Sequence, residues 1–243
     1  MRYLIRFSYD GSRYNGYQKQ VDAITIQGEL ENALTKINDN KEVSVVASGR
    51  TDRGVHALNQ CAHFDLSINI TCDKLKMALN SILPNDIYIK EVCEMDDSFH
   101  ARFNVKSKEY IYKINLGEYN PLECNYVYQY NNALNIDEMK KAIKIFEGEH
   151  NFKSFAAAAD QRESYVREIF KTSITLDNNI LTISFVGNGF LRYMVRNMVG
   201  ILIEIGEGKR KYTDINDILT LEDRKEAGKT APSEGLYLKE VYY

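Results

Sequence analysis

The most concentrated group of polar side chains in this 243-residue chain is the segment Ser48–His56, which reads SGRTDRGVH. Its two glycines bracket Asp52, which stands between Arg50 and Arg53. Glycine permits backbone angles and close approaches that a Cβ would block, so a ligand can reach such a loop. Neighbouring cations favour the ionised form of a carboxyl group. The segment predicts an ionised acid in a loop that attracts phosphate, although a tight surface turn with solvated arginines fits the same residues.

Other chemistries have little support in the sequence. Asp52, His56 and His63 are possible metal ligands, but the chain has only four histidines and no accompanying carboxylate cluster, so we expect no metal. No second carboxylate occupies a comparable loop, as a glycosidase would need. Nucleophile-elbow, P-loop and dinucleotide motifs are absent, so we expect neither a serine nucleophile nor a nucleotide cofactor.

Two pairs of side chains elsewhere have helical or strand spacing. Arg192 and Arg196 are four residues apart in an apolar segment, so on a helix they would share a face. A buried arginine needs an anion, and either a salt bridge or a substrate phosphate would supply it. Tyr110 and Tyr112 would point to one side of a strand, as core residues or as a platform for an unstacked RNA base.

Composition limits the class of protein. The charges sum to −3, so the chain has no global attraction for nucleic acid or an anionic membrane, and a nucleic-acid partner would require a local basic surface. The N-terminal MRYLIRFSYD is charged where a signal peptide is apolar, and no stretch approaches the roughly 18 apolar residues of a membrane helix. We expect a cytoplasmic protein with no membrane partner. The four cysteines form no C-x-x-C and should be reduced thiols.

Hydrophobic periodicity predicts the elements that must position these residues. In the first half Thr25 is placed to cap a helix that starts at Ile26, and Pro84 ends a second helix. The expected elements are strand Tyr3–Tyr9, helix Ile26–Ile37, strands Val43–Ala47 and Ala57–Leu66, helix Asp73–Leu83 and strand Ile87–Val92.

The second half repeats this order without visible sequence identity. Its expected elements are strand Lys108–Leu116, helix Ile136–Glu147, strands Glu168–Leu176 and Ile180–Val186, a largely buried helix Gly189–Ile205, a short helix Thr213–Leu221 and strand Gly235–Tyr243. Both halves follow the order β-α-β-β-α-β. We therefore predict an α+β protein with two ferredoxin-like halves, 1–100 and 101–243, forming a mainly antiparallel sheet with helices on one face.

Motifs along the whole chain resemble those of one family, the TruA-type tRNA pseudouridine synthases. The resemblance rests mainly on the SGRTDRGVHA loop and on GFLRYMVRNMVG at 189–200. Further matching segments are YDGS at 9–12, TIQG at 25–28, HARF at 100–103, YIY at 110–112, FEG at 146–148 and SEGL at 233–236. They occur in the order of the family from one end of the chain to the other.

The resemblance implies an enzyme that isomerises uridine to pseudouridine at nucleotides 38, 39 and 40 of the tRNA anticodon stem-loop. It implies no cofactor, an active cleft between two ferredoxin-like halves, and a homodimer that binds tRNA. Asp52 matches the catalytic aspartate, and Arg196 matches the arginine that pairs with the catalytic carboxylate. Tyr110 matches the catalytic tyrosine that stacks on the flipped uracil and helps the proton leave. Arg50 matches an arginine that helps to extrude the base. Arg102 and Arg192 are further candidates for substrate binding.

The sequence departs from the family at two positions. Tyr17 replaces a usual Trp, and Arg53 replaces a usually small residue beside the aspartate. Two competing functions are a non-catalytic RNA-binding protein built of ferredoxin-like modules and, more remotely, a metal-dependent nucleic-acid hydrolase. Asp52 argues against the first because a carboxylate repels phosphate, and the missing carboxylate cluster argues against the second.

Overall fold

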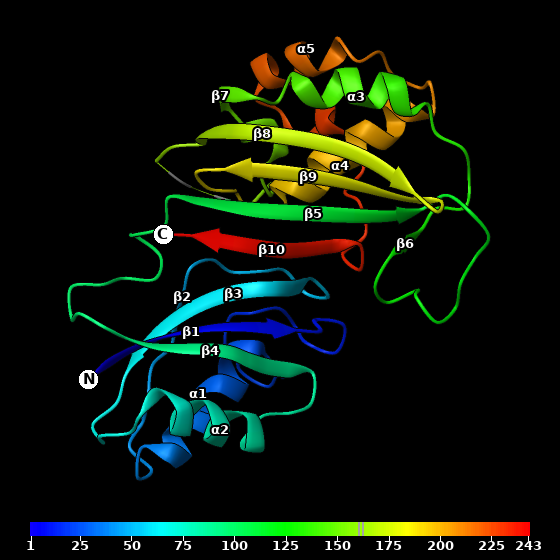
Figure 1. Cartoon of the computed structure of the whole chain (residues 1–243). Coiled ribbons are helices and arrows are strands. Elements are labelled where there is room, and N and C mark those ends of the chain that lie inside the picture. The colour runs from blue at the N-terminus through cyan, green and yellow to red at the C-terminus, as the bar shows by residue number, and fades with distance from the viewer. Residues whose placement is uncertain (160, 162) are drawn as a thin grey trace. The chain divides into compact units, whose positions relative to one another are not determined.

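The computed structural model describes residues 1–159, 161 and 163–243, and the chain divides into two compact units. The first unit comprises Met1–Lys106 together with Tyr237–Tyr243, and the second comprises Ser107–Leu236. Figure 1 shows the elements of both. No helix of the described residues is long and apolar enough to cross a membrane.

The first unit contains a small sheet and two helices that pack against each other. Its elements are β1 (Arg2–Tyr9), α1 (Ile26–Ile37), β2 (Val46–Ala47), β3 (His56–Asp65), α2 (Cys72–Ile82), β4 (Ile87–Met95) and β10 (Leu236–Tyr242). The strand order is β4-β1-β3-β10, and β2 pairs with β3. The alternation read from the sequence puts Tyr3, Ile5, Phe7 and Tyr9 of β1 in the core, as predicted.

Thr25 caps α1 as predicted, because its side chain accepts a hydrogen bond from the Gly28 N–H. The strand expected from Val43 to Ala47 is reduced to the two residues of β2. The N–H groups of Val43 and Val45 donate instead to the side chains of Thr35 and Glu31 on α1. Both valines are buried, which accounts for the strand-like alternation in the sequence. Their backbone N–H groups nevertheless bond to side chains of a helix and not to a neighbouring strand.

The strands of the second unit follow the order β5-β9-β8-β7, and β6 pairs with β5. Its elements are β5 (Ser107–Asn115), β6 (Tyr128–Gln129), α3 (Ile136–Lys144), β7 (Gly148–Asn151), β8 (Val166–Asp177), β9 (Ile180–Gly187), α4 (Met194–Gly206) and α5 (Asp214–Leu221), with 3₁₀ turns η1 (Lys153–Phe155) and η2 (Arg224–Ala227). Helix α3 packs on α4 and β8. The short strands β6 and β7 were not predicted.

The expectation of a mainly antiparallel sheet is wrong, because the pairing is mixed. Strand β10 runs parallel to β3, and β6 runs parallel to β5. Parallel neighbours arise where the chain returns to a strand through a long connection instead of a hairpin. Residues 116–127 form such a connection between β5 and β6. The remaining pairs described within each unit are antiparallel.

The helix expected over Gly189–Ile205 begins only at Met194. Tyr193, the residue before it, has a φ of 65°, in the left-handed region, so a helix cannot run through it. Arg192 therefore lies outside the helix, and the prediction that it shares a helical face with Arg196 is wrong. The part that is helical is buried on most sides, as its apolar sequence predicted.

Candidate active site

The loop that carries Asp52 connects β2 to β3 in the first unit, and its beginning is fixed to β3. The Ser48 hydroxyl donates to Oε1 of Gln60 at 2.6 Å, and the Gln60 amide donates to the Gly49 carbonyl at 2.9 Å. The Ser48 N–H donates to the Cys61 carbonyl at 2.8 Å. Ser48 and Gln60 are completely buried, so this anchor is protected from water.

Thr51 fixes the middle of the loop. Its hydroxyl lies 2.8 Å from the hydroxyl of Tyr9 on β1, and its carbonyl accepts the Tyr17 N–H at 3.1 Å. The next residue, Asp52, begins a tight turn in which its carbonyl accepts the Val55 N–H at 3.2 Å. Gly54 supplies the positive φ, 76°, that the turn requires. Thr51 and Val55 are buried and hold the loop backbone in place, whereas Asp52 between them is half-buried and stays partly accessible to solvent.

The end of the loop is held by the segment after β1. The N–H of Gly11 donates to Nδ1 of His56 at 3.1 Å, and a carboxylate oxygen of Asp10 lies 3.2 Å from the same nitrogen. A Cβ at Gly11 would lie 2.0 Å from the Val55 carbonyl oxygen, so only glycine fits there. The sequence suggested His56 as a metal ligand at most, whereas the structure gives it a role in fixing the loop. Among the described residues, no group of three or more His, Cys, Asp or Glu side chains could hold a metal ion.

The arginines predicted in the first unit are exposed. Arg50 and Arg53 flank Asp52 in the loop and extend into solvent. Arg102 lies in a turn after β4, and its guanidinium is 5.9 Å from the centre of the Phe103 ring. All three cations are therefore available to a charged ligand.

Tyr110 and Tyr112 lie on β5 of the second unit, and their environments differ. Tyr110 pairs with Phe185 of β9 and meets the ring of Phe190 edge to face at 4.9 Å. Tyr112 is completely buried, and its hydroxyl donates to the Pro232 carbonyl at 2.8 Å. The hydroxyl of Tyr112 thus has a structural partner, which assigns it to the core.

Tyr193 brings Arg192 and Arg196 together in the second unit, although they do not share a helix. Both guanidinium groups lie over its ring, at 5.0 Å for Arg192 and 5.2 Å for Arg196. The Arg196 Nε also donates to the Ala231 carbonyl at 2.7 Å, which orients the guanidinium. Tyr193 was not predicted as a site residue, and the signal that could have identified it in the sequence is an aromatic residue between two arginines.

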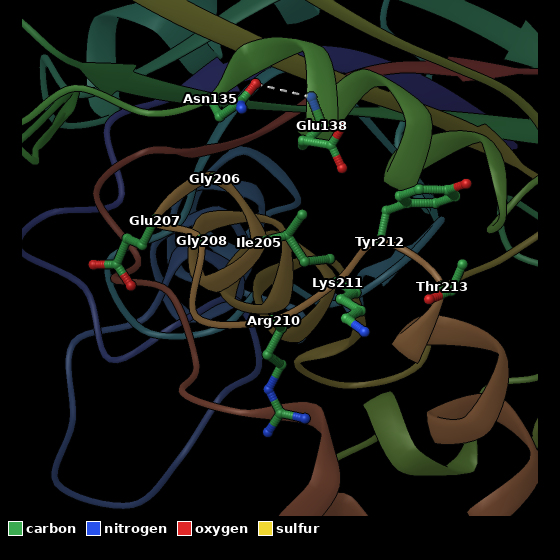
Figure 2. Close-up of a pocket in the computed structure, with 10 residues that line it drawn as sticks. All are labelled: Asn135, Glu138, Ile205, Gly206, Glu207, Gly208, Arg210, Lys211, Tyr212 and Thr213. Atoms are coloured by element: carbon green, nitrogen blue, oxygen red, sulfur yellow. Dashed lines mark hydrogen bonds between the residues drawn. The ribbon is translucent and has the colours of Figure 1, made fainter.

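A hollow of about 530 Å³ in the second unit lies elsewhere and contains none of the predicted site residues. Its lining, drawn in Figure 2, is Asn135, Glu138, Ile205, Gly206, Glu207, Gly208, Arg210, Lys211, Tyr212 and Thr213. The Asn135 side chain accepts the Glu138 N–H at 3.2 Å and so caps α3. The predicted residues thus lie in three places: Arg50 and Asp52 in one loop, Arg102 in a turn, and Tyr110, Arg192 and Arg196 in the second unit.

Comparison with known proteins assigns these residues to a family. The sequence model of a family described as tRNA pseudouridine synthase matches residues 5–104 and 142–243. The chain belongs to this tRNA pseudouridine synthase family. The resemblance read from its motifs is thereby confirmed. The matched ranges contain the Asp52 loop, Arg102, Arg192 and Arg196, whereas Tyr110 lies in the stretch that the family model leaves unmatched.

Curated relatives in the synthase family align over nearly the full chain. A protein named tRNA pseudouridine synthase A from Geobacillus sp. (strain WCH70) is 46% identical over 97% of this chain and 96% of its own length. A protein of the same name from Caldicellulosiruptor saccharolyticus is 43% identical over 99% of this chain and 98% of its own length. Another from Limosilactobacillus reuteri is 43% identical over 100% of this chain and 96% of its own length. The similarity to these synthases therefore extends across both units.

Proposed function

We propose that this protein isomerises uridine to pseudouridine in tRNA, at nucleotides 38, 39 and 40 of the anticodon stem-loop, with Asp52 as the nucleophile. The observation that carries the proposal is the loop of Asp52. Hydrogen bonds to Tyr9 and Tyr17 hold Thr51 on one side of the aspartate, and the turn to Val55 closes the other side. This loop lies within the range that matches the synthase family. A carboxylate on a rigid backbone suits a nucleophile, because little motion is needed at the moment of attack.

The reaction needs no oxidant, reductant or group donor. The bond between C1′ of the ribose and N1 of uracil breaks, and a bond between C1′ and C5 forms. C5 loses a proton and N1 gains one, so substrate and product are isomers. The Asp52 carboxylate attacks the nucleoside and the base detaches and turns; the bond to Asp52 then breaks as the base rejoins through C5, which returns the free carboxylate. The residues of the chain can therefore carry the whole reaction.

The target base must first leave its stack, because the glycosidic carbon of a stacked nucleotide is out of reach. Extrusion costs a few kcal/mol, and stacking on an aromatic ring returns about 1 to 3 kcal/mol. We assign this stacking to Tyr110 and assistance of extrusion to Arg50. Arg196 keeps the nucleophile ionised, and Arg102 and Arg192 bind phosphates.

We extend the proposal to the assembly and the fold. The protein acts as a homodimer on tRNA in the cytoplasm, and each half of the chain is a variant of the ferredoxin-like order. The motif resemblance supports the dimer. The neighbours β4-β1-β3, with β2 on β3, support the ferredoxin-like order in the first unit.

The decisive experiment measures tritium release from unmodified tRNA that contains 5-tritiated uridine. Formation of the C1′–C5 bond expels the label, so release reports the isomerisation directly. We expect release by the wild-type protein and none by Asp52→Asn, because a neutral amide is not a nucleophile. Asp39→Asn is the matched control: Asp39 is exposed, and its φ of 55° is one that Asn tolerates. Residual tritium release by Asp52→Asn above a few per cent of the wild-type rate would exclude the assigned role. Primer-extension mapping would identify the modified nucleotides.

A second experiment separates the two tyrosines of β5. We expect Tyr110→Leu to suppress turnover strongly, because it removes the aromatic ring that we assign to the flipped base. Tyr112→Phe should retain most of the turnover and lose about 1 kcal/mol of stability, because it removes only the hydrogen bond to Pro232. Equal turnover in the two variants would show that both tyrosines are structural.

A further inference from the structure

An aromatic stack reaches the surface of the first unit in the turn after β4. The ring of His63 on β3 contacts His100 at 4.8 Å between centroids, and His100 stacks on Phe103 at 4.2 Å with only 27° between their planes. His63 is buried, whereas Phe103 is 75% exposed. The stack therefore begins in the core and ends in an open aromatic face.

The turn that carries Phe103 is held by side chains rather than by a helix or sheet. Nδ1 of His100 accepts the N–H groups of Arg102 and Phe103 at 3.2 and 3.3 Å. The Asn104 side chain accepts the His100 N–H at 2.6 Å, and the Asn104 N–H donates to the His100 carbonyl at 3.0 Å. These four hydrogen bonds close residues 100–104 into a defined loop, and the ring contact with His100 at 4.2 Å positions the Phe103 side chain.

Ala101, which is completely buried, fixes this turn to the rest of the first unit. The Ala101 N–H donates to Nδ1 of His63 at 3.1 Å, and its carbonyl accepts the Tyr243 hydroxyl at 2.8 Å. The Phe99 carbonyl accepts a hydrogen bond from Arg2 at 2.9 Å. The Phe103 ring, 75% exposed on this hydrogen-bonded turn, leaves an aromatic face open to a planar partner.

The charges around the ring suit a nucleotide. The Arg102 guanidinium lies 5.9 Å from the Phe103 centroid, beyond close stacking distance, and both side chains are exposed. The exposed carboxylates of Asp96 and Asp97 precede the turn, and both attract Arg2, which also pairs with Asp65 at 2.8 Å. An aromatic face with an adjacent guanidinium is the combination that binds an unstacked base and its phosphate.

We infer that the exposed face of Phe103 is a stacking site for one unpaired nucleobase of the RNA substrate, and that Arg102 contacts a phosphate beside that base. The inference rests on the proposed function, and it adds the base contact of Phe103 to the phosphate contact already assigned to Arg102. The site is sequence-tolerant, because every base has an aromatic face. It uses none of the side chains assigned to the chemical step, so its loss should weaken binding of RNA without removing the nucleophile.

The test measures the Kd for an unmodified tRNA transcript by fluorescence anisotropy. Phe103→Ala and Phe103→Leu should each raise the Kd by about 5- to 150-fold, because neither side chain stacks. Phe103→Trp should bind within about threefold of the wild type, since indole stacks at least as well. Tyr88→Ala is the matched control, because Tyr88 is an exposed aromatic residue on β4 of the same unit. Wild-type affinity in both Phe103→Ala and Phe103→Leu would overturn the inference, and so would a loss in Phe103→Ala that Leu restores.

The salt dependence of binding tests the contact between Arg102 and a phosphate. Arg102→Gln should reduce the slope of log Kd against log salt by about 0.7 to 0.9, the value of one phosphate contact, and Phe103→Leu should leave the slope unchanged. Equal slopes in wild type and Arg102→Gln would exclude the phosphate contact. Light scattering provides a further check: if Phe103→Leu changes the oligomeric state, the ring contacts a second copy of the chain and the inference is wrong.

Tritium release by the same variants keeps the two proposals separate. Saturating RNA should restore near wild-type turnover in Phe103→Leu. If the wild-type protein releases no tritium, the proposed function fails. If it releases tritium and the Phe103 variants bind like wild type, only the stacking site fails.

Discussion

The hydroxyl of Tyr17 is buried, and no described residue provides it with a hydrogen-bond partner. The side chain is 2% exposed, and burial raises the pKa of the phenol well above its ordinary value. Its backbone is held in place, because its N–H donates to Thr51 and its carbonyl accepts the Gln27 N–H at 2.9 Å. The ring therefore cannot rotate outward to hydrate the hydroxyl. We predict that Tyr17→Phe stabilises the protein.

The magnitude follows from the desolvation of one hydroxyl. An unpaired polar group in the core costs about 1 to 3 kcal/mol, and Phe recovers most of this because it differs from Tyr only by the oxygen. For a chain of this size 1 kcal/mol corresponds to about 2 to 4 °C in the unfolding midpoint, so the expected rise is about 2 to 12 °C. Differential scanning calorimetry measures it directly. Circular dichroism in urea provides the free energy of unfolding in a chain that has no Trp.

Tyr9→Phe is the control, with the opposite expected sign. The Tyr9 side chain is also buried, at 4% exposed, but its hydroxyl lies 2.8 Å from that of Thr51. Removing it breaks a buried hydrogen bond and leaves Thr51 with one partner fewer, which costs about 1 to 3 kcal/mol. If Tyr17→Phe destabilises the protein as much as Tyr9→Phe does, the Tyr17 hydroxyl is hydrogen-bonded in solution and the reasoning is refuted.

Two further predictions concern a backbone contact and a titrating group. Gly11→Ala should displace the Asp52 loop and reduce both stability and tritium release, because its Cβ would lie 2.0 Å from the Val55 carbonyl oxygen. Gly189→Ala is the control and should have a small effect, because its Cβ would lie at an ordinary 3.5 Å from its nearest neighbour. A fully active Gly11→Ala would show that the loop tolerates movement. Burial lowers the pKa of His63 below 6.5, so as the pH falls the unfolded chain takes up the proton first and folding loses stability below about pH 6.5. His63→Asn keeps an acceptor for the Ala101 N–H but does not titrate. Urea unfolding should therefore show that this variant loses less stability between about pH 7 and 5 than the wild type does. Identical losses would assign the pH dependence to other groups.

Local chemistry accounts for what could be predicted from the sequence. The alternation from Tyr3 to Tyr9 needs only a buried face, and Thr25 needs only the free N–H groups of a helix start, so both predictions were correct. The SGRTDRGVHA and FLRYMVRN segments were sufficient to assign the family without coordinates. These features depend on neighbours along the chain, which the sequence contains completely.

Only the tertiary structure decided where such patterns end and how distant segments pair. Val43 and Val45 have the spacing of a strand, yet α1 takes their N–H groups. The parallel pairing of β10 with β3 joins residues that are far apart in the chain, and no local pattern encodes it. The left-handed backbone angle of Tyr193 delays the start of the predicted helix to Met194, and the Tyr193 ring contacts both of the arginines that the sequence had placed on one helix. Residue types thus identify the chemistry, whereas competition for hydrogen bonds and packing among distant segments positions the side chains that perform it.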